Sequence, residues 1–505
     1  MEHFDVLVVG AGISGIGAGY HLQTHCPNKS WAIFEARDAL GGTWDLFRYP
    51  GIRSDSDMYT LGFSFRPWTQ PKAIADGPSI LKYLQDTAKD HGIDEHIRFG
   101  NRVKRAAWDS ATSLWTVDYE AGEARRPAQV TCRFLHMCAG YYNYAAGYRP
   151  TFPTEERFKG VIVHPQFWPA DLDYSGKRVV VIGSGATAVT LVPQLATTAA
   201  HVTMLQRSPT YVVSRPAEDA LANKLRARLP AKLAYHIIRW RNVLFGMYFY
   251  NMTRKRPAQA KAGIIAMVRA QLGPDYDVDK HFTPTYNPWD QRLCLVPDAD
   301  LFDAIKDGSA EVVTDQISGF VETGVALASG EVIEADIIVA ATGLDMQLMS
   351  GLEAFVDGDR INFPQTFSYK GMMYSGTPNL ASSFGYTNAS WTLKADLTAE
   401  YLCRLINYMD RKGYTECRPV AAEAIETTPW LDFTSGYVQR ALSRLPRQGT
   451  KAPWRVYQNY ALDLLAFRFG KIEDGVLRFS RGHAADNRPS RAAEVIARPA
   501  ELADA

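Results

Sequence analysis

Val6-Leu-Val-Val-Gly10-Ala-Gly12-Ile-Ser14-Gly15 is the stretch that decides the fold, because Val179-Val-Val-Ile-Gly183-Ser-Gly185-Ala-Thr-Ala188 repeats its plan. Each stretch begins with a continuous apolar run, as expected for a parallel strand buried on both faces. Each then breaks into glycines and continues at helical spacing, through Leu22 and Leu195 respectively. The repeat predicts an α/β fold with two Rossmann-like dinucleotide-binding domains.

The glycines of the first stretch each have a physical task at a bound dinucleotide. Gly10 allows the tight turn, Gly12 lets the backbone approach the pyrophosphate, and Gly15 lets the helix pack closely on the strand. The N-terminus of the helix then faces the phosphate charge. Glu35 ends the next strand, where a carboxylate can accept hydrogen bonds from both ribose hydroxyls. This selects FAD or NAD, and the alternative is a solvated surface glutamate.

Two differences indicate another nucleotide at the second stretch. Ala188 replaces the third glycine, and the strand that begins at His201 ends in Gln206-Arg207 where the first copy has Glu35. An arginine pairs with a 2′-phosphate, whereas a carboxylate repels it. The second copy therefore predicts NADPH, unless Arg207 is only a surface residue. FAD is favoured for the first copy because Gly41-Gly42-Thr43-Trp44 offers close backbone contact to a flat ring system.

The internal repeat also predicts the domain organisation. Residues 1–145 form the first part of the FAD-binding domain, and residues 146–345 form the NADP-binding domain. The second domain contains a helical insertion at about 220–280. Residues 346–482 return to the FAD domain and close the substrate site, and 483–505 form a flexible tail.

Composition places the chain among ordinary globular proteins. Its 505 residues are 46% hydrophobic and 22% charged, which allows two or three domains with their own cores. A net charge of +1 gives no electrostatic footprint of a nucleic-acid binder. The cysteines lack a Cys-x-x-Cys or metal-ligand spacing, so we expect free thiols in a reducing cytosol and no metal site. They are Cys26, Cys132, Cys138, Cys294, Cys403 and Cys417.

The sequence does not predict a membrane-spanning protein. The chain runs directly into the strand that starts near Phe4, so we expect no signal peptide and a cytoplasmic location. The greasiest later stretch, Leu233–Met252, is interrupted by Arg239 and Arg241, and no transmembrane segment is predicted. We interpret it as a helix packed on a domain. A weak membrane-surface or self-association role stays open.

A more specific signal lies between the two glycine stretches. Phe158-x-Gly160-x-x-x-His164-x-x-x-Trp168-Pro169 resembles the fingerprint of the type I Baeyer–Villiger monooxygenases. Their N-hydroxylating and flavin-containing relatives carry Tyr or Phe followed by Lys or Arg in place of Trp168-Pro169. A second family signature is Gly41-Gly42-x-Trp44-x-x-x-x-Tyr49-Pro50-Gly51-x-x-x-Asp55. Longer strings at 51–59, 286–294 and 385–391 look like the mycobacterial ethionamide monooxygenase branch of the family.

The resemblance implies the chemistry and the catalytic residues. The family uses NADPH and O2 to convert ketones to esters or lactones through a flavin peroxide. Arg292 matches the arginine that stabilises the peroxide and the tetrahedral adduct, and its alternative is a structural salt bridge. Asp55 matches the aspartate that orients this arginine, and its alternative is a helix N-cap. Asp57 is the better candidate for the cap. The same cofactor chemistry implies sulfoxidation as a side activity on thioethers.

The candidate site therefore combines FAD, NADP(H), O2 and a ketone or thioether substrate, with Arg292 and Asp55 as catalytic residues. The candidate FAD-binding residues are Gly10, Gly12, Ser14, Gly15, Glu35, Gly42, Thr43, Trp44, Asp45, Leu46, Arg53, Ser54, Asp55 and Val103. The candidate NADP-binding residues are Gly183, Ser184, Gly185, Ala186, Thr187, Ala188, Gln206 and Arg207.

Further residues matter to the resemblance without being assigned to catalysis. His164 and Trp168 lie in the family's connection between the nucleotide domains, so we expect structural coupling in preference to a general-base role. Trp391 and Asn388 resemble positions near the nicotinamide, although core packing is the alternative. One departure concerns Gln291, where many members have a lysine for the 2′-phosphate. The preference for NADPH then depends more heavily on Arg207.

Three other functions stay open. A flavin-containing monooxygenase acting mainly on N or S nucleophiles would need no arginine for an oxyanion. A disulfide reductase also pairs FAD with NADPH, but it needs a redox cysteine pair beside the flavin, and the spacing offers none. A nucleotide-bound structural or sensor protein would show no O2 consumption coupled to NADPH oxidation.

Overall fold

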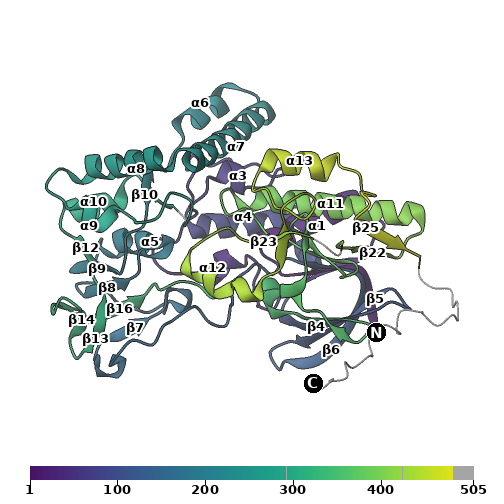
Figure 1. The fold of residues 1–505 in the computed structure, drawn as a ribbon, viewed down its shortest axis with the longest axis horizontal. Coiled ribbons are helices and arrows are strands. Elements are labelled where there is room, and N and C mark those ends of the chain that lie inside the picture. The colour runs from purple at the N-terminus through teal and green to yellow at the C-terminus, as the bar shows by residue number, and fades with distance from the viewer. Residues whose placement is uncertain (292, 423–424, 482–505) are drawn as a thin grey trace, which may run out of the picture.

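The computed structural model describes residues 1–291, 293–422 and 425–481. Its two largest sheets lie side by side, each with its own helices (Figure 1). The predicted α/β class with two Rossmann-like domains is confirmed. Arg292 and the expected tail at 483–505 lie outside the described residues.

The first sheet has nine strands in the order β18-β17-β4-β5-β6-β1-β2-β3, with β21 also pairing with β6. The central pairs β6-β1-β2-β3 are parallel, whereas β4-β5 and β5-β6 are antiparallel. The strands are β1 (Glu2–Val9), β2 (Trp31–Phe34), β3 (Ile97–Arg98), β4 (Asn101–Asp109), β5 (Leu114–Ala121), β6 (Arg126–Met137), β17 (Glu353–Val356), β18 (Asp359–Arg360) and β21 (Leu380–Ser382).

Residues 6–9 of strand β1 are all apolar because both faces of this part of the strand are covered. Val6 and Val8 face a core shared with helices α1 (Ile13–His25), α4 (Gly77–Asp90) and α11 (Trp391–Lys412). Leu7 and Val9 face the opposite core, which contains side chains of β4, β5 and β6. A strand covered on both faces gains from an apolar side chain at each position, because all of them leave water.

The second sheet has five strands in the order β12-β9-β8-β16-β7, and every pair in it is parallel. Helices α5 (Ala186–Leu195) and α10 (Asp300–Lys306) share a core with one face, and a small antiparallel sheet covers the other. The strands are β7 (Val161–Val163), β8 (Arg178–Ile182), β9 (His201–Gln206), β12 (Ala310–Thr314) and β16 (Ile337–Ala340), with β13 (Ile317–Val321), β14 (Gly324–Leu327) and β15 (Val332–Glu334) in the small sheet.

Three helices form a block at one edge of the molecule, above both sheets in Figure 1. They are α6 (Ala220–Arg228), α7 (Ala231–Lys255) and α8 (Pro257–Leu272). Helix α13 (Tyr460–Arg468) lies beside α7 at the same edge. The C-terminal part of the chain therefore returns to the first domain and also reaches the helical block.

The remaining elements are short. The helices are α2 (Thr43–Leu46), α3 (Met58–Leu61), α9 (Val278–Phe282) and α12 (Gly436–Ala441). The strands are β10 (Val212–Arg215), β11 (Cys294–Pro297), β19 (Ser368–Tyr369), β20 (Met373–Tyr374), β22 (Glu416–Pro419), β23 (Thr427–Pro429), β24 (Arg447–Gly449) and β25 (Leu477–Ser480). The 3-10 helices are η1 (Asp94–His96), η2 (Glu155–Arg157), η3 (Pro165–Phe167), η4 (Leu348–Gly351), η5 (Phe363–Gln365) and η6 (Leu442–Arg444). Within the described ranges, no helix combines the length and the apolarity needed to cross a bilayer.

Candidate functional site

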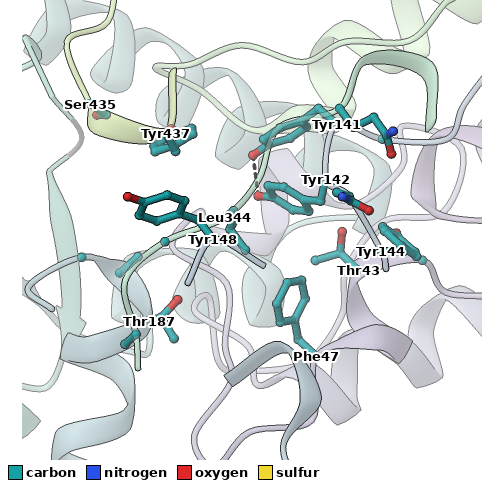
Figure 2. Close-up of a pocket in the computed structure, with 18 of the residues that line it drawn as sticks. Thr43, Phe47, Tyr141, Tyr142, Tyr144, Tyr148, Thr187, Leu344, Ser435 and Tyr437 are labelled. Carbon is teal, nitrogen blue, oxygen red and sulfur yellow. Dashed lines mark hydrogen bonds between the residues drawn. The ribbon is translucent and has the colours of Figure 1, made fainter. Parts of the chain in front are cut away.

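Both glycine loops open onto one cavity. It has a volume of about 1110 Å³, and Gly10 and Gly12 line it from the first domain. Gly183 and Gly185 line it from the second domain. Figure 2 shows the tyrosines and loop residues that surround it. Two loops of the same design thus share one space, although more than 160 residues separate them in the sequence.

The first loop has the open backbone that a phosphate needs. Gly10 has φ +104°, and a Cβ there would lie 2.7 Å from the carbonyl oxygen of Cys138. Helix α1 begins after Gly12 without a side-chain cap, so its first amide groups remain available to an anion. A Cβ on Gly42 would lie 3.0 Å from the Cα of Gly12, which brings the Gly41–Gly42 loop directly against the turn. Gly15 lies behind the turn, where a Cβ would meet Gly10.

Glu35 follows β2 and is only 6% exposed, which excludes a solvated surface residue. Its Oε2 accepts a 2.7 Å hydrogen bond from the amide of Ala11, and Oε1 accepts a 2.9 Å bond from the amide of Arg37. Burial raises the pKa of this carboxyl, while the two amides favour its charged form. Glu35 also lines the cavity, so its remaining lone pairs could accept hydrogen bonds from hydroxyl groups of a ligand.

The second loop repeats this arrangement at α5. Gly183 has φ +135°, and a Cβ there would lie 2.4 Å from the carbonyl oxygen of Ala341. Gly185 precedes the helix without a side-chain cap, and a Cβ on it would meet nothing within 4 Å. Ala188 is fully buried in the second core and does not line the cavity. Its methyl group fits there, so no third glycine is needed.

Gln206 and Arg207, at the end of β9, point to different places: one to the core and the other to the cavity. Gln206 is 2% exposed, and its Nε2 donates to the carbonyl of His281 at 2.7 Å and to Oγ1 of Thr314 at 2.8 Å. It does not line the cavity. Arg207 is exposed and lines the cavity beside the second glycine loop. Of the two residues, only Arg207 therefore faces the cavity.

The other predicted cofactor residues fall into two groups. The residues that line the cavity are Ser14, Thr43, Trp44, Arg53, Ser54, Asp55, Val103, Ser184, Ala186 and Thr187. Asp45 and Leu46 do not line it. Asp45 is buried and forms ion pairs with Arg37 and Arg48, so its role is to hold the loop after α2. Of the two predicted catalytic residues, Asp55 lines the cavity, and Arg292 lies outside the described residues.

The signature around Tyr49 and Gly51 lies at the contact between the domains. Gly51 has φ +75°, and a Cβ there would lie 2.9 Å from the Cβ of Gln194 on α5. Tyr49 forms a side-chain hydrogen bond with Thr187, and burial raises the pKa of its phenol to about 12. Arg53 forms an ion pair with Asp300 at the start of α10. The Tyr-Pro-Gly signature therefore joins the two nucleotide domains.

The two chain crossings between the sheets are bonded to each other. The first runs from 138 to 160 and the second from 341 to 352. The amide of Asn143 donates to the carbonyl of Asp345 at 2.8 Å, and the amide of Tyr148 donates to the carbonyl of Gly343 at 3.1 Å. The domains are thus linked by a two-stranded ribbon.

His164 packs on this ribbon. A Cβ on Gly147 would lie 2.1 Å from its Cε1, and its Nδ1 accepts a hydrogen bond from the amide of Gln166. Burial lowers the pKa of the imidazole, which favours its neutral form. His164 is not among the residues that line the cavity. This placement supports the predicted structural coupling over general-base catalysis.

Sequence reasoning missed an aromatic wall. The hydroxyl oxygens of Tyr141 and Tyr142 lie 2.5 Å apart, and Tyr437 approaches from α12 (Figure 2). Tyr144 lies near Gly42 and Thr43, and burial raises the pKa of its phenol to about 12. The available signal was the run Tyr141-Tyr-Asn-Tyr144 directly after the end of a strand. Nothing in the spacing joins that run to Tyr437.

Trp391 and Asn388 have different positions. Trp391 lines the cavity, stacks on Tyr141 with ring centroids 5.1 Å apart, and donates from Nε1 to Oγ of Ser14. Asn388 does not line the cavity, and its Nδ2 donates to the carbonyl of Gln458 at 2.9 Å. Of these two residues, only Trp391 therefore faces the cavity between the two glycine loops.

Redox-active cysteines and metal ligands do not gather at the cavity. All six cysteines are buried. Cys138 and Cys294 line the cavity, but they belong to different domains. Across the part of the chain that the structure describes, no group of three or more His, Cys, Asp or Glu side chains could hold a metal ion. The arrangement offers nucleotide binding without a dithiol, which weakens the disulfide-reductase alternative.

Comparison with known families agrees with this geometry. Residues 69–357, more than half of the chain, match the model of the flavin-binding monooxygenase-like family. The chain belongs to the flavin-binding monooxygenase-like family. Residues 8–71 of this family member also match the NAD(P)-binding Rossmann-like domain model.

Two curated proteins are similar to this chain over almost its whole length. It is 55% identical over 484 residues to the FAD-containing monooxygenase EthA of Mycobacterium tuberculosis, covering 95% of this chain and 98% of that protein. It is 47% identical over 483 residues to the probable FAD-binding monooxygenase AlmA of Acinetobacter baylyi, covering 95% and 97%. The predicted resemblance to the mycobacterial branch is confirmed.

Solved structures share the fold at lower identity. An oxidised steroid monooxygenase bound to NADP has a TM-score of 0.74 at 24% identity, covering 94% of this chain and 99% of that one. The cyclohexanone monooxygenase of Rhodococcus sp. Phi1 bound to NADP+ has a TM-score of 0.70 at 23% identity, covering 83% and 87%. The architecture of two dinucleotide domains is thus common to this flavin-binding monooxygenase-like protein and those enzymes.

Proposed function

We propose that this protein is a Baeyer–Villiger monooxygenase that binds FAD and NADPH. FAD would lie at the first glycine loop and Glu35, called here the first cradle. NADPH would lie at the second glycine loop and Arg207, called the second cradle. The observation that carries the proposal is the single cavity lined by both glycine loops, with Glu35 on one side and Arg207 on the other. A cavity of about 1110 Å³ exceeds the roughly 300–1,000 Å³ of most small-molecule sites, as two nucleotides require.

The residues present fit FAD in the first cradle. The uncapped start of α1 offers amide groups to the pyrophosphate, and Glu35 offers a buried carboxylate to the ribose. The close approach of Gly42 to Gly12 leaves backbone, and no side chain, beside the turn. In the second cradle, Arg207 offers a charge that pairs with the 2′-phosphate of NADPH. When bound, these cofactors supply the hydride and the activation of O2.

The proposed reaction is the insertion of one oxygen atom beside a ketone carbonyl. A ketone, O2, NADPH and a proton give an ester or lactone, NADP+ and water. Arg292 would hold negative charge on the oxygen of the reacting carbonyl, because its guanidinium stays protonated. Asp55, which lines the cavity, would orient that guanidinium. The aromatic wall of Tyr141, Tyr142 and Tyr437 would exclude water.

The fingerprint that ends in Trp168-Pro169 supports ketone oxidation over a reaction restricted to nitrogen and sulfur. A thioether needs no oxyanion at a carbonyl, so sulfoxidation should be less sensitive to Arg292. This difference gives the test its two readouts.

The experiment is mass-spectrometric product analysis of the purified holoenzyme with NADPH and O2. The substrates are linear, cyclic and aryl ketones and one thioether, each given to the natural protein and to Arg292→Ala. We expect esters or lactones from the natural protein, and from Arg292→Ala a loss of ketone oxidation of about a hundredfold or more with sulfoxide formation retained. Sulfoxide alone from the natural protein would instead establish a monooxygenase of soft nucleophiles.

A further inference from the structure

Helix α7 carries a row of large apolar side chains on its solvent-exposed face. Leu233, Ile237, Trp240, Leu244 and Tyr248 follow one another at spacings of four, three, four and four residues. They therefore form one stripe along the helix, called here the outer ridge. Their exposed fractions are 49%, 40%, 38%, 55% and 68%. A helix packed on a domain normally presents polar residues there.

The opposite face of α7 already has its own partners. Ala234, Ile238 and Val243 are buried on it. The side chain of Arg239 points inward, and its Nη1 donates to the carbonyls of Tyr59 at 2.9 Å and Gly62 at 3.0 Å. The helix is therefore anchored to α3 without using the outer ridge.

The two arginines that interrupt the apolar sequence do not interrupt the ridge. Arg239 is 6% exposed, and its guanidinium donates hydrogen bonds to backbone carbonyls. Arg241 is half-buried and forms an ion pair with Asp219 at the start of α6. The outer ridge is therefore apolar from Leu233 to Tyr248.

Neighbouring elements extend this apolar surface. The ring of Trp240 lies 5.9 Å from the ring of Tyr460, centroid to centroid, which places α13 beside α7. Helix α13 exposes Leu462 at 50% and Leu465 at 57%, and Phe469 after its end is 74% exposed. Helices α6, α7 and α13 lie along one edge of the molecule in Figure 1.

The charged residues in the segment that carries the ridge all have one sign. Residues 220–272 contain eleven lysines and arginines and no aspartate or glutamate, although the whole chain has a net charge of only +1. Exposed cations stand at both ends of the ridge, at Arg228 and Lys232 before it and at Lys255 and Arg256 after it. Arg254 is also exposed but forms ion pairs with Asp290 and Asp432. The eleven are Lys224, Arg226, Arg228, Lys232, Arg239, Arg241, Arg254, Lys255, Arg256, Lys261 and Arg269.

We propose that this edge of the molecule docks on an anionic lipid surface. The outer ridge, with Leu462 and Leu465, would enter the headgroup and upper acyl region, while the flanking lysines and arginines would contact lipid phosphates. A second copy of the chain is disfavoured as the occupant, because a two-fold contact through this edge would bring two clusters of positive charge together. The proposal does not depend on the reaction that the enzyme catalyses.

The test is flotation of the FAD-loaded full chain with lipid vesicles. One set contains phosphatidylcholine alone, and the other contains phosphatidylcholine with phosphatidylglycerol. We expect the protein to float with the phosphatidylglycerol vesicles and to be released by high salt. The variants Leu244→Glu and Tyr248→Glu should each partition at least about tenfold less, since each exchanges an inserted apolar side chain for a charge.

The matched control is Val332→Glu, which makes the same kind of change at an exposed valine of β15 in the second domain. Its partitioning should equal that of the natural protein. Unchanged thermal midpoints and retained flavin establish that the variants are folded. No flotation of the natural protein, equal flotation of Leu244→Glu, or equal binding to uncharged vesicles would each overturn the proposal. A natural dimer that Leu244→Glu dissociates, without vesicle binding, would assign the ridge to a second copy instead.

Discussion

The indole Nε1 of Trp391 donates a 2.7 Å hydrogen bond to Oγ of Ser14. These residues are separated by 377 positions, and each stands in the first turn of its helix, α11 and α1. The bond therefore ties the C-terminal part of the chain to the glycine loop of the first cradle. It also explains how residues that follow the second domain help to shape the nucleotide site.

Removing this bond should weaken FAD binding. Trp391→Phe keeps most of the ring stacking on Tyr141 but loses the N–H donor, so we expect the Kd for FAD to rise several-fold, equivalent to about 1 kcal/mol. Ser14→Ala should have a similar effect. If the bond is responsible, the double variant will lose less than the two single variants combined, as measured by FAD titration. Fully additive losses would show that the two side chains act separately.

Glu35→Gln should reduce the affinity for FAD by about tenfold to a hundredfold. The substitution keeps the shape of the side chain but removes a charge-assisted acceptor from the ribose. Glu123→Gln, an exposed change of the same type, serves as the control. Flavin absorbance of the purified proteins and equilibrium titration with FAD give the comparison. Normal flavin content in Glu35→Gln would contradict the assignment of this carboxylate.

Arg207→Ala should change the choice of coenzyme. Losing the guanidinium removes the partner of the 2′-phosphate, so the KM for NADPH should rise about tenfold to a hundredfold, while the KM for NADH stays nearly constant. Steady-state kinetics with both coenzymes measure the change. Arg126→Ala, at an exposed arginine of β6, should leave both values as they are. An equal rise for both coenzymes would exclude recognition of the 2′-phosphate by Arg207.

Gly51→Ala should disturb the contact between the domains. The added methyl would meet Gln194 at 2.9 Å, in addition to the strain of φ +75°. Gly92→Ala is the matched control, since Gly92 has φ +64° and nothing within 4 Å of its Cβ position. We expect about 1 kcal/mol of destabilisation from the backbone strain alone and roughly 1–3 kcal/mol more at Gly51. Thermal unfolding and the KM for NADPH are the readouts, and identical behaviour of the two variants would contradict this explanation.

His136 should make the fold sensitive to acid. It is fully buried on β6, where its ring forms a hydrogen bond with the hydroxyl of Ser383. Burial lowers the pKa of the ring from 6.5 to about 4. Between these values the unfolded chain binds a proton that the folded chain does not, so stability falls as the pH drops from 6.5 toward 4. At 1.36 kcal/mol per pH unit, the loss is about 3 kcal/mol.

His136→Gln should remove that part of the pH dependence. Unfolding free energies measured from pH 7.5 down to pH 4 should fall less steeply for the variant than for the natural protein. His3→Gln, at an exposed histidine, should follow the natural protein. Parallel curves for all three proteins would rule out His136 as the titrating group.

The parts of the fold that follow from local chemistry were predictable. The two strand–glycine–helix units depend on neighbours in the sequence, and Asp57 does cap α3 by accepting from the amide of Thr60. The burial of Glu35 follows from its position at the end of a covered strand. Gln206 was less predictable, because one residue of difference decides whether a side chain after β9 faces the core or the cavity.

Features assembled from distant segments were not predictable. The aromatic wall joins Tyr141 to Tyr437, and no periodicity relates their positions. Helix α7 is apolar on two faces, so its sequence pattern could not show which face is covered. Arg239 illustrates the difficulty. In the sequence it interrupts an apolar stretch, but in the structure its side chain points inward and donates to three backbone carbonyls.

The amide of Tyr148 and the carbonyl of Gly343 meet at 3.1 Å, so the chain enters and leaves the second domain at nearly the same point. A segment whose two ends lie side by side can be replaced by another without distorting the rest of the protein. Grafting the corresponding segment of a relative between these two residues should therefore transplant coenzyme choice as a unit, while the first sheet keeps its order.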